Sequence, residues 1–232
     1  MGPKGAREAF TVHVAAKRID LFGIEFSETV ITSFAVTLAL ILIAVVIRIF
    51  VLPRFKDKPG KFQNVIEIIV DGINGFANTT AGEYGSKIAS YGFTLGLFLV
   101  VSGLLELFSI RAPGTDLNFT IAISAVSFLL INAFGLIEKG IWGRIKSFTK
   151  PNVVAGFFRF ISDLVLPVSL SCRMFGNLLS GLVIMELIYY ALGPFVIGVG
   201  AALAIFFNLF HVLMQAYVFL MLTFSFIHEA TE

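Results

Sequence analysis

Charged side chains are scarce in this sequence, and their scarcity excludes a water-soluble globule. Only 14% of the 232 residues are Asp, Glu, Lys or Arg, whereas 57% are hydrophobic. So little polar surface cannot coat a soluble domain of this size. We therefore predict an all-α integral membrane protein that forms a single membrane domain.

Cysteine and histidine are also rare. The single cysteine, Cys172, excludes a disulfide within the chain and a metal site built from cysteines. The three histidines, His13, His211 and His228, lack the spacing of a metal cluster. The sequence has no phosphate-binding glycine loop and no nucleophile–base arrangement, so we expect no covalent catalysis, no metal and no cofactor. A net charge of only +2 gives no indication of a nucleic-acid partner.

Five stretches are long and apolar enough to cross a membrane core of about 30 Å. The predicted crossing segments are residues 30–51, 90–110, 119–137, 157–192 and 200–227. The first 29 residues precede them as an N-terminal segment. No cleaved signal peptide is expected there, because the residues after Lys4 and Arg7 lack an apolar core of the required length.

Basic residues follow the first and third predicted spans and orient the chain. Arg54, Lys56, Lys58 and Lys61 come after the first span and are opposed only by Asp57. The loop after the third span is basic as well. Because such loops stay on the cytoplasmic side, we expect the N-terminus outside and the C-terminus in the cytoplasm.

Residues 62–84 are predicted to form an amphipathic helix rather than a span. Apolar residues recur there at steps of three and four from Phe62 to Phe76, whereas Glu67, Asp71 and Asn74 share another face. This pattern favours a helix that lies along the membrane surface. The alternative is a soluble-type helix packed on a partner.

The last two spans are longer than a bilayer is thick. At 1.5 Å per residue, residues 157–192 give about 54 Å of helix and residues 200–227 about 42 Å. Helices with excess apolar length tilt or kink. We therefore predict a steeply tilted hairpin, in which Pro167 is a candidate bend.

Arg173 lies near the middle of the first of these two helices. A charge at this depth is costly, and arginine stays protonated even when it is desolvated. At about 100° per residue, Arg173 shares one helix face with Asn177 and with the hydroxyls of Ser169 and Ser180. We interpret this face as functional. The alternative is small-residue packing around an arginine that extends towards the membrane surface.

A second polar stripe lies on the last helix, where Asn208, His211 and Gln215 follow at steps of three and four. In an antiparallel hairpin, this stripe can face the Arg173 stripe and form a wet or ion-conducting path. Glu186 points away from Arg173, about 220° round the helix. An intramembrane carboxylate in that position is a candidate for proton handling in a separate cavity.

Three further polar residues lie near the membrane boundary: Glu106, Asp116 and Asn118. They are candidates for a channel entrance. For Glu106 and Asp116, an ordinary solvated carboxylate at the end of a helix is equally compatible with the sequence.

The sequence resembles subunit a of the bacterial F-type ATP synthases. The most specific match is residues 167–177, where a proline and a serine–leucine step are followed by arginine, an apolar pair, glycine and asparagine. Residues 59–63 are similar to the start of that family's surface helix, residues 113–120 to its link before the third span, and residues 215–219 to its last helix. The resemblance extends from about Leu21 to the C-terminus.

The resemblance implies a stator subunit of the membrane sector, in a bacterial plasma membrane or, alternatively, a plastid membrane. Its expected partners are a ring of c subunits, b-type peripheral stalk subunits, the remainder of the F1Fo complex and membrane lipid. Two half-channels would bring protons, or sodium ions, to a carboxylate on the ring. Arg173 matches the family's arginine at the seam between them, and Asn177 and Gln215 match residues that line the path.

Two positions depart from the family pattern. Many members carry a glutamate or histidine nine residues after the arginine, where this chain has Leu182. We predict that Glu186, one turn later, takes this half-channel role. Some members carry a histidine seven residues before the glutamine, where this chain has Asn208, with His211 about one turn on.

A rival interpretation is a free-standing secondary transporter or channel in which Arg173 binds an anionic solute at the midplane. Internal repeats would favour it, and the sequence shows none. A membrane enzyme is the third possibility, but the sequence has no recognisable active site.

Overall fold

The computed structural model describes residues 18–21, 24–55, 60–108, 110–147, 153–192 and 198–231. The N-terminal residues up to 17 and the basic residues Lys56 and Lys58 lie outside this part. The principal elements, in chain order, are β1 (Arg18–Leu21), β2 (Ile24–Ser27), α2 (Glu28–Val46), α3 (Lys61–Ala81), α4 (Gly85–Leu104), α5 (Leu117–Ser147), α6 (Val153–Leu192) and α7 (Val199–Thr231).

The all-α membrane architecture is confirmed. Within the described residues, five helical stretches are long and apolar enough to cross a membrane: Glu28–Arg54, Lys61–Phe108, Leu117–Gly140, Val165–Met185 and Ile205–Thr231. One small departure precedes them, because β1 and β2 pair as an antiparallel ribbon in which Leu21 lies opposite Ile24.

The first apolar helix changes its winding before it ends. α2 passes into a π-helical turn, Ile47–Val51, and then a 3₁₀ turn, Leu52–Arg54. Pro53 explains this ending, because its nitrogen has no hydrogen to donate and its ring crowds the carbonyl of the preceding turn. The outer surface of α2 is apolar and uncovered, so it faces lipid or another subunit.

The amphipathic helix α3 packs on the bundle only through its second half. Ala77 and Ala81 are fully buried, whereas Phe62, Val65 and Ile69 are exposed. α3 ends at Gly82, whose φ of 60° lies in the left-handed region that glycine adopts without strain. A location of α3 along the membrane surface stays a prediction.

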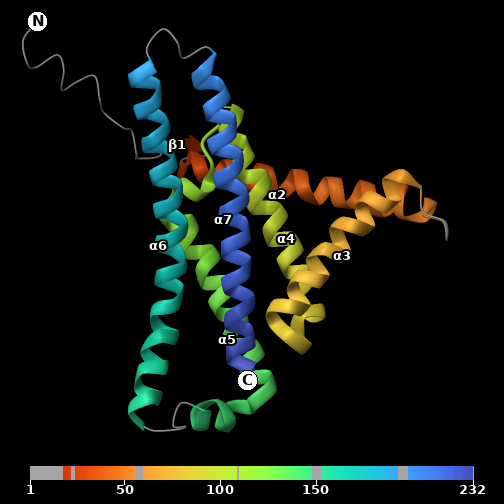
Figure 1. Cartoon of the computed structure of the whole chain (residues 1–232), viewed down its shortest axis with the longest axis vertical. Helices are drawn as coiled ribbons and strands as arrows, with labels where there is room; N and C mark the ends of the chain where they lie inside the picture. Colours follow the sequence, from red (N-terminus) through yellow and green to blue (C-terminus); the bar gives the residue numbers. More distant parts are fainter. Residues whose placement is uncertain are drawn as a thin grey trace, which may run out of the picture.

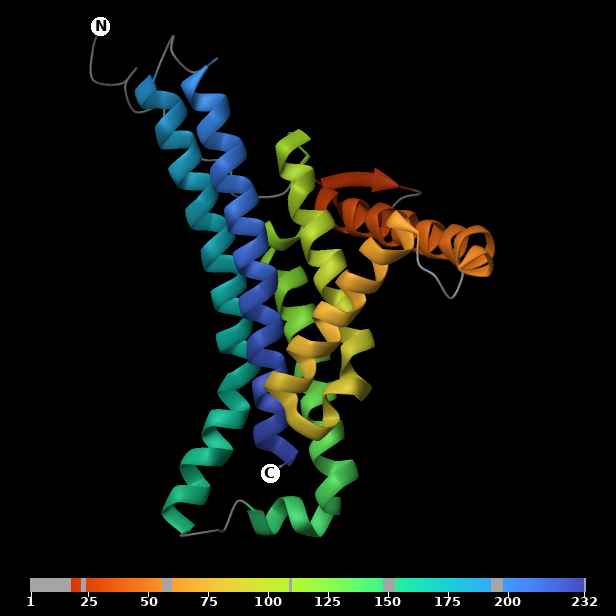
Figure 2. The same cartoon turned by 45° about the vertical axis from the view of Figure 1, so that its right-hand side comes forward.

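α6 and α7 form a long antiparallel hairpin. They have 40 and 33 residues, or about 60 and 50 Å of helix, and α6 continues through Pro167. Figures 1 and 2 show the two helices side by side, with α2 lying across their direction. The hairpin is about twice as long as the bilayer core is thick. Its steep tilt in the membrane stays a prediction.

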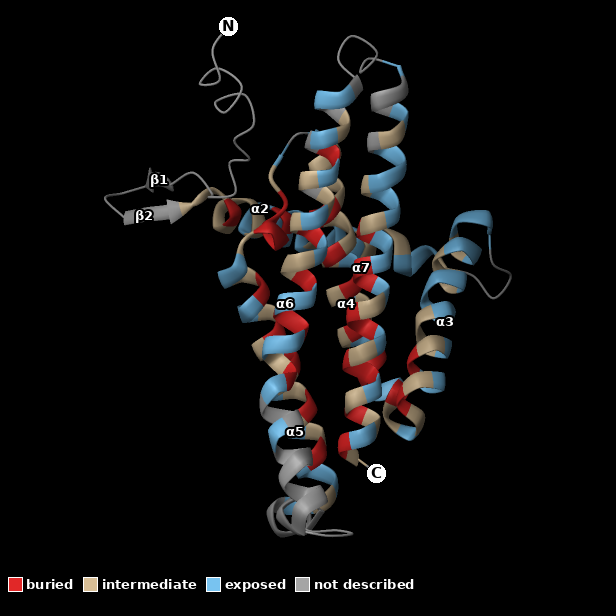
Figure 3. Ribbon diagram, turned by 60° about the vertical axis from the view of Figure 1, so that its left-hand side comes forward, coloured by how far each residue is buried: buried red, intermediate tan, exposed pale blue. Residues whose placement is uncertain are grey.

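α7 is the centre of the packing. It contacts α3, α4, α5 and α6, and Figure 3 shows its buried residues concentrated in the half that ends at the C-terminus. Glycines on α4 permit the close approach: a Cβ at Gly92 would meet the ring of Phe224, and one at Gly103 would lie 2.6 Å from a Val212 methyl carbon. Small residues that let helix backbones approach are typical of packing inside membranes.

α5 extends further than the predicted span. It runs to Ser147, with a bend at Gly140, where φ is 65°. Its start is joined to α6 by a hydrogen bond of 3.2 Å between the hydroxyls of Thr120 and Ser171, both of them buried. This contact fixes the height of α6 relative to α5, about half a turn before Arg173.

Candidate functional site: a polar path between α6 and α7

Arg173 lies on the outer face of α6. The neighbouring residues Leu170 and Met174 are buried in the core, so the helix turns its arginine outwards. Within the described part of the chain, the guanidinium forms no hydrogen bond or ion pair. It lines a cavity of about 10 Å³ together with Asn177 and Gln215, close to the room that one water molecule needs.

A larger cavity of about 210 Å³ lies between α6, α7 and the 3₁₀ turn that follows α4. Its polar lining comes from Glu106 in that turn, from Asn177 and Ser180 on α6, and from Asn208 and His211 on α7. Three segments that are far apart in the sequence therefore bring a carboxylate, an imidazole and two amides to one space.

Unsatisfied polar atoms mark the same region. His211 Nε2 and both polar atoms of the Gln215 amide are buried and have no hydrogen-bond partner among the described residues. Gln215 is only 7% exposed. Buried polar groups are normally hydrogen-bonded, so buried atoms without a hydrogen-bond partner here indicate that water, an ion or a partner chain binds them.

Asn177 connects the two cavities, because it lines both of them. The polar residues consequently form one line: Glu106, His211 and Asn208 at one end, Asn177 in the middle, and Arg173 with Gln215 at the other. The hairpin also leaves space beside the His211 ring. A Cβ on Gly181 would lie 3.5 Å from the His211 ring, so the absence of a side chain there keeps space beside the imidazole.

Asp116 and Asn118 lie at the start of α5 and line neither of these cavities. Asp116 Oδ2 accepts hydrogen bonds from Thr29 Oγ1 at 2.8 Å and from Ser27 Oγ at 3.2 Å, and Oδ1 accepts one from the Asn118 backbone N–H at 3.0 Å. Asp116 therefore caps α5 and ties it to the start of α2.

The side chains of Glu186 and Leu182 lie outside the described part of the structure, so the role of Glu186 stays a prediction. Sequence reasoning treated Glu106 as a candidate for a channel entrance or as a solvated carboxylate at a helix end, and did not place it beside His211. It also did not single out Ser102, which lines a cavity of about 20 Å³ with Gln215. The Ser102 hydroxyl donates to the Leu99 carbonyl, a bond common in any apolar helix, so the sequence held no signal for it.

Taken together, the long antiparallel hairpin, the polar residues that line the cavities beside it and an arginine with no partner among the described residues define a multi-pass membrane protein with polar groups inside an apolar bundle. Residues 31–228 match the model of the ATP synthase A chain family. The chain therefore belongs to this family, whose members are stator components in the membrane sector of ATP synthases and work with the other subunits of the complex.

Curated relatives agree with this membership. The chain is 34% identical to ATP synthase subunit a 3 of Pelobacter propionicus over 182 residues, which are 76% of this chain and 77% of that protein. It is 29% identical to ATP synthase subunit a of Geotalea daltonii, over 86% of this chain and 87% of the relative. With Trichlorobacter lovleyi subunit a the identity is 30%, over 84% and 85%. Bacterial relatives and apolar helices agree on a multi-pass protein of the plasma membrane.

Proposed function

We propose that this chain conducts ions, protons or alternatively sodium ions, past a rotating ring of c subunits, with Arg173 at the point of transfer. The observation that carries the proposal is the polar line that leads from Glu106 and His211 through Asn177 to Arg173. Asn177, Arg173 and His211 belong to an otherwise apolar hairpin, and Glu106 joins them from the turn after α4. Unneeded polar groups at these positions would destabilise the fold.

Arg173 supplies a permanent positive charge on the face that a ring would contact. Its guanidinium has no partner within the described residues, and a cation at this depth requires an anion or water. A carboxylate on a passing c subunit meets that requirement. As it approaches, the arginine favours its charged form, so the bound ion leaves for the adjacent cavity, and the fixed charge also blocks direct leakage between the two half-channels.

The 210 Å³ cavity is proposed as part of one half-channel. Glu106 supplies its carboxylate and His211 a second titratable group, which together can pass a proton through water. This assignment explains how the chain could relay protons although Leu182 and Asn208 occupy the positions where many family members carry a titratable residue. Glu186 remains the candidate for the second half-channel.

The same proposal extends to orientation and partners. With the basic loop that contains Arg54 in the cytoplasm, the N-terminus lies outside and the C-terminus inside. The c-ring would contact the outer face of α6 and α7. Peripheral stalk subunits of the b type, the rest of the complex and membrane lipid would cover the apolar surface that remains, including α2.

The first test is ATP-driven ion pumping in vesicles that carry Arg173→Ala in the assembled complex, with subunit content checked by mass spectrometry. We expect pumping to fall below about a tenth of the wild-type rate while the complex still assembles, because at least one charge interaction worth about 1.4 kcal/mol is lost at the transfer step. Coupled pumping at the normal rate would refute the ion-path role and favour a solute-binding arginine.

A second test assigns the carboxylates. Glu106→Gln and Glu186→Gln are compared with Glu83→Gln, which removes an exposed carboxylate from the turn between α3 and α4. We expect Glu106→Gln to slow pumping several-fold and Glu83→Gln to leave it unchanged. If Glu106→Gln pumps normally and Glu186→Gln does not, the relay passes through Glu186 and the cavity assignment fails.

A further inference from the structure

A further pocket lies far from the polar path, between the end of the first span and the start of α3. It measures about 500 Å³ and is lined by Phe50, Val51, Arg54, Phe55, Gly60, Lys61, Phe62 and Gln63. A volume of this size is typical of a pocket for a small organic ligand. Nothing in the ion-conducting function uses it.

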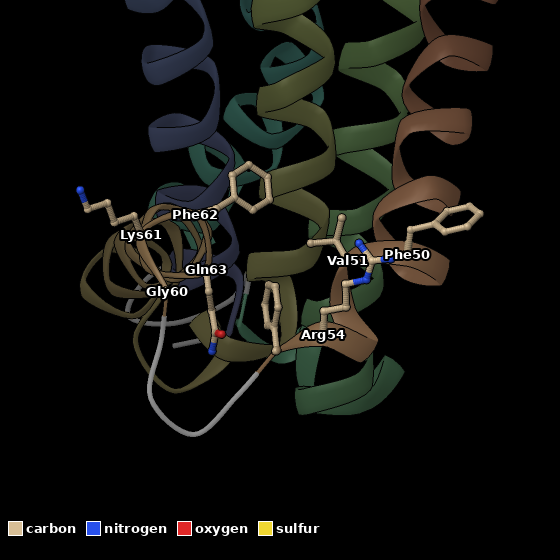
Figure 4. Close-up of a pocket in the computed structure, with 8 residues that line it drawn as sticks. Phe50, Val51, Arg54, Gly60, Lys61, Phe62 and Gln63 are labelled. Carbon is tan, nitrogen blue, oxygen red and sulfur yellow. The ribbon is translucent and has the colours of Figure 1, made fainter.

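One wall of this pocket carries positive charge. Figure 4 shows Arg54 on the side formed by the end of the first span, and Lys61 on the other side with its ammonium group directed away from the pocket. Neither side chain forms an ion pair or hydrogen bond within the described residues. Arg54 is therefore the cation available to a ligand in the pocket, because its planar guanidinium can donate two parallel hydrogen bonds to a phosphate.

The opposite wall contains the N-terminus of α3, a helix of 21 residues. The first helical hydrogen bond runs from Asn64 N to Gly60 O at 2.9 Å, so the N–H groups of Lys61 and Phe62 precede the helical ladder. No side chain caps this end, and its first turn contains no acidic residue. The end of the helix therefore presents partial positive charge on the wall opposite Arg54.

The remaining surface of the pocket is aromatic and apolar. Phe50 is 59% exposed and Phe62 is 64% exposed, and Phe55 completes the lining. A soluble anion would gain nothing from these rings, whereas a molecule with a phosphate and an acyl chain would satisfy both kinds of surface. The pocket also lies where an apolar span ends, which is the level of the lipid head groups.

We propose that this pocket binds an anionic phospholipid. Its phosphate would lie between the Arg54 guanidinium and the first N–H groups of α3, and its acyl chain would run over Phe50 and Phe62. This combination of an arginine, an uncapped helix end and exposed aromatic rings matches the two halves of such a lipid. The bound lipid would hold α3 against the end of the first span, where the protein itself supplies few contacts.

The test uses the intact complex reconstituted in vesicles that contain phosphatidylglycerol with a photoactivatable group in its acyl chain. A parallel sample contains the same group on phosphatidylcholine. Mass spectrometry then measures labelling of the peptide around residues 50–63. We expect phosphatidylglycerol to label this peptide several-fold more than phosphatidylcholine.

Two arginines provide a matched pair of variants. Arg54→Gln should lower labelling by phosphatidylglycerol about tenfold, to the phosphatidylcholine level, because one charge-assisted pair is lost. Arg48→Gln removes an exposed cation from the π turn that precedes Arg54, outside the pocket, and should change labelling less than twofold. Lys61→Gln should have an intermediate effect, because its ammonium points away.

Three results would overturn the proposal. Equal labelling by the two lipids would mean that the rings alone attract acyl chains. Displacement of the label by millimolar glycerol phosphate would make the site one for a soluble anion. No labelling in the intact complex would mean that another subunit covers the pocket. Subunit content verifies assembly of each variant, and because labelling needs no ion transport, failure here is distinct from failure of the Arg173 experiment.

Discussion

Three glycines offer a graded test of how closely α7 packs on its neighbours. Gly92 faces the ring of Phe224, Gly96 would place a Cβ 2.9 Å from Leu220 Cδ1, and Gly72 on α3 has no atom within 4 Å of a Cβ built there. Each is replaced by alanine. The three substitutions add the same methyl group to a helix, so their differences report packing alone.

The loss of stability expected for Gly92→Ala follows from how tightly Phe224 is packed. Phe224 is 0% exposed, and its ring lies 5.7 Å from that of Phe76, which hinders its retreat. Overpacking a rigid site costs up to about 3 kcal/mol. Replacing glycine by alanine in a helix stabilises it by about 1 kcal/mol through helix propensity. The free energy of unfolding of Gly92→Ala should therefore be lower by about 2 kcal/mol.

The other two sites should behave differently. At Gly96, the crowded atom is the end of a flexible leucine, so a packing cost of about 1 kcal/mol and the propensity gain nearly cancel. At Gly72, only the gain remains, and stability should rise by up to about 1 kcal/mol. The free energy of unfolding is measured by SDS titration of the purified chain in micelles, followed by far-ultraviolet circular dichroism. If Gly92→Ala is as stable as Gly72→Ala, the tight contact with Phe224 does not exist.

Three further substitutions test the site. Gln215→Leu removes two buried, unpartnered polar atoms and should raise unfolding free energy by about 1–2 kcal/mol while abolishing ATP-driven pumping; lower stability would mean that the amide is bonded in the membrane. Asp116→Ala should lower unfolding free energy by about 1–2 kcal/mol through loss of the α5 cap, yet leave pumping per assembled complex unchanged; slowed pumping would return Asp116 to the ion path. Gly181→Ala should pump normally, because its Cβ would be at ordinary contact distance from His211, whereas Gly181→Leu should obstruct the cavity and slow pumping severalfold in complexes of normal subunit content. Equal pumping by both Gly181 variants would contradict the cavity assignment.

The helices were predictable from the sequence because their signals are local. Apolar length indicated the five spans, and steps of three and four indicated α3. The ends were less predictable. Loss of one hydrogen bond at Pro53 loosens the turn before it, and Gly140 bends α5 instead of ending it. The ribbon of β1 and β2 was missed, although Ile19, Leu21, Ile24 and Phe26 show the alternation of paired strands.

The candidate site was predictable only within each helix. Helical spacing alone brings Arg173 and Asn177 to one face of α6. No spacing rule relates Glu106 to His211, because their meeting depends on how α4, α6 and α7 pack together, and that packing depends on glycines that carry no polar signal. For the same reason, the role of Asp116 as a cap that joins α2 to α5 was not distinguishable from that of a channel carboxylate.

The central position of α7 has a mechanical consequence for a stator. Its C-terminal half, with Phe224 and Ile227 fully buried, is held among α3, α4 and α5, whereas its N-terminal half borders the open cavity beside His211. The C-terminal half of α7 is thus held in place by packing, whereas the N-terminal half is held less tightly. A sideways force from a rotating partner would bend the half near the cavity before it moved the packed half. The packed half therefore limits how far this force can displace the polar residues on α7.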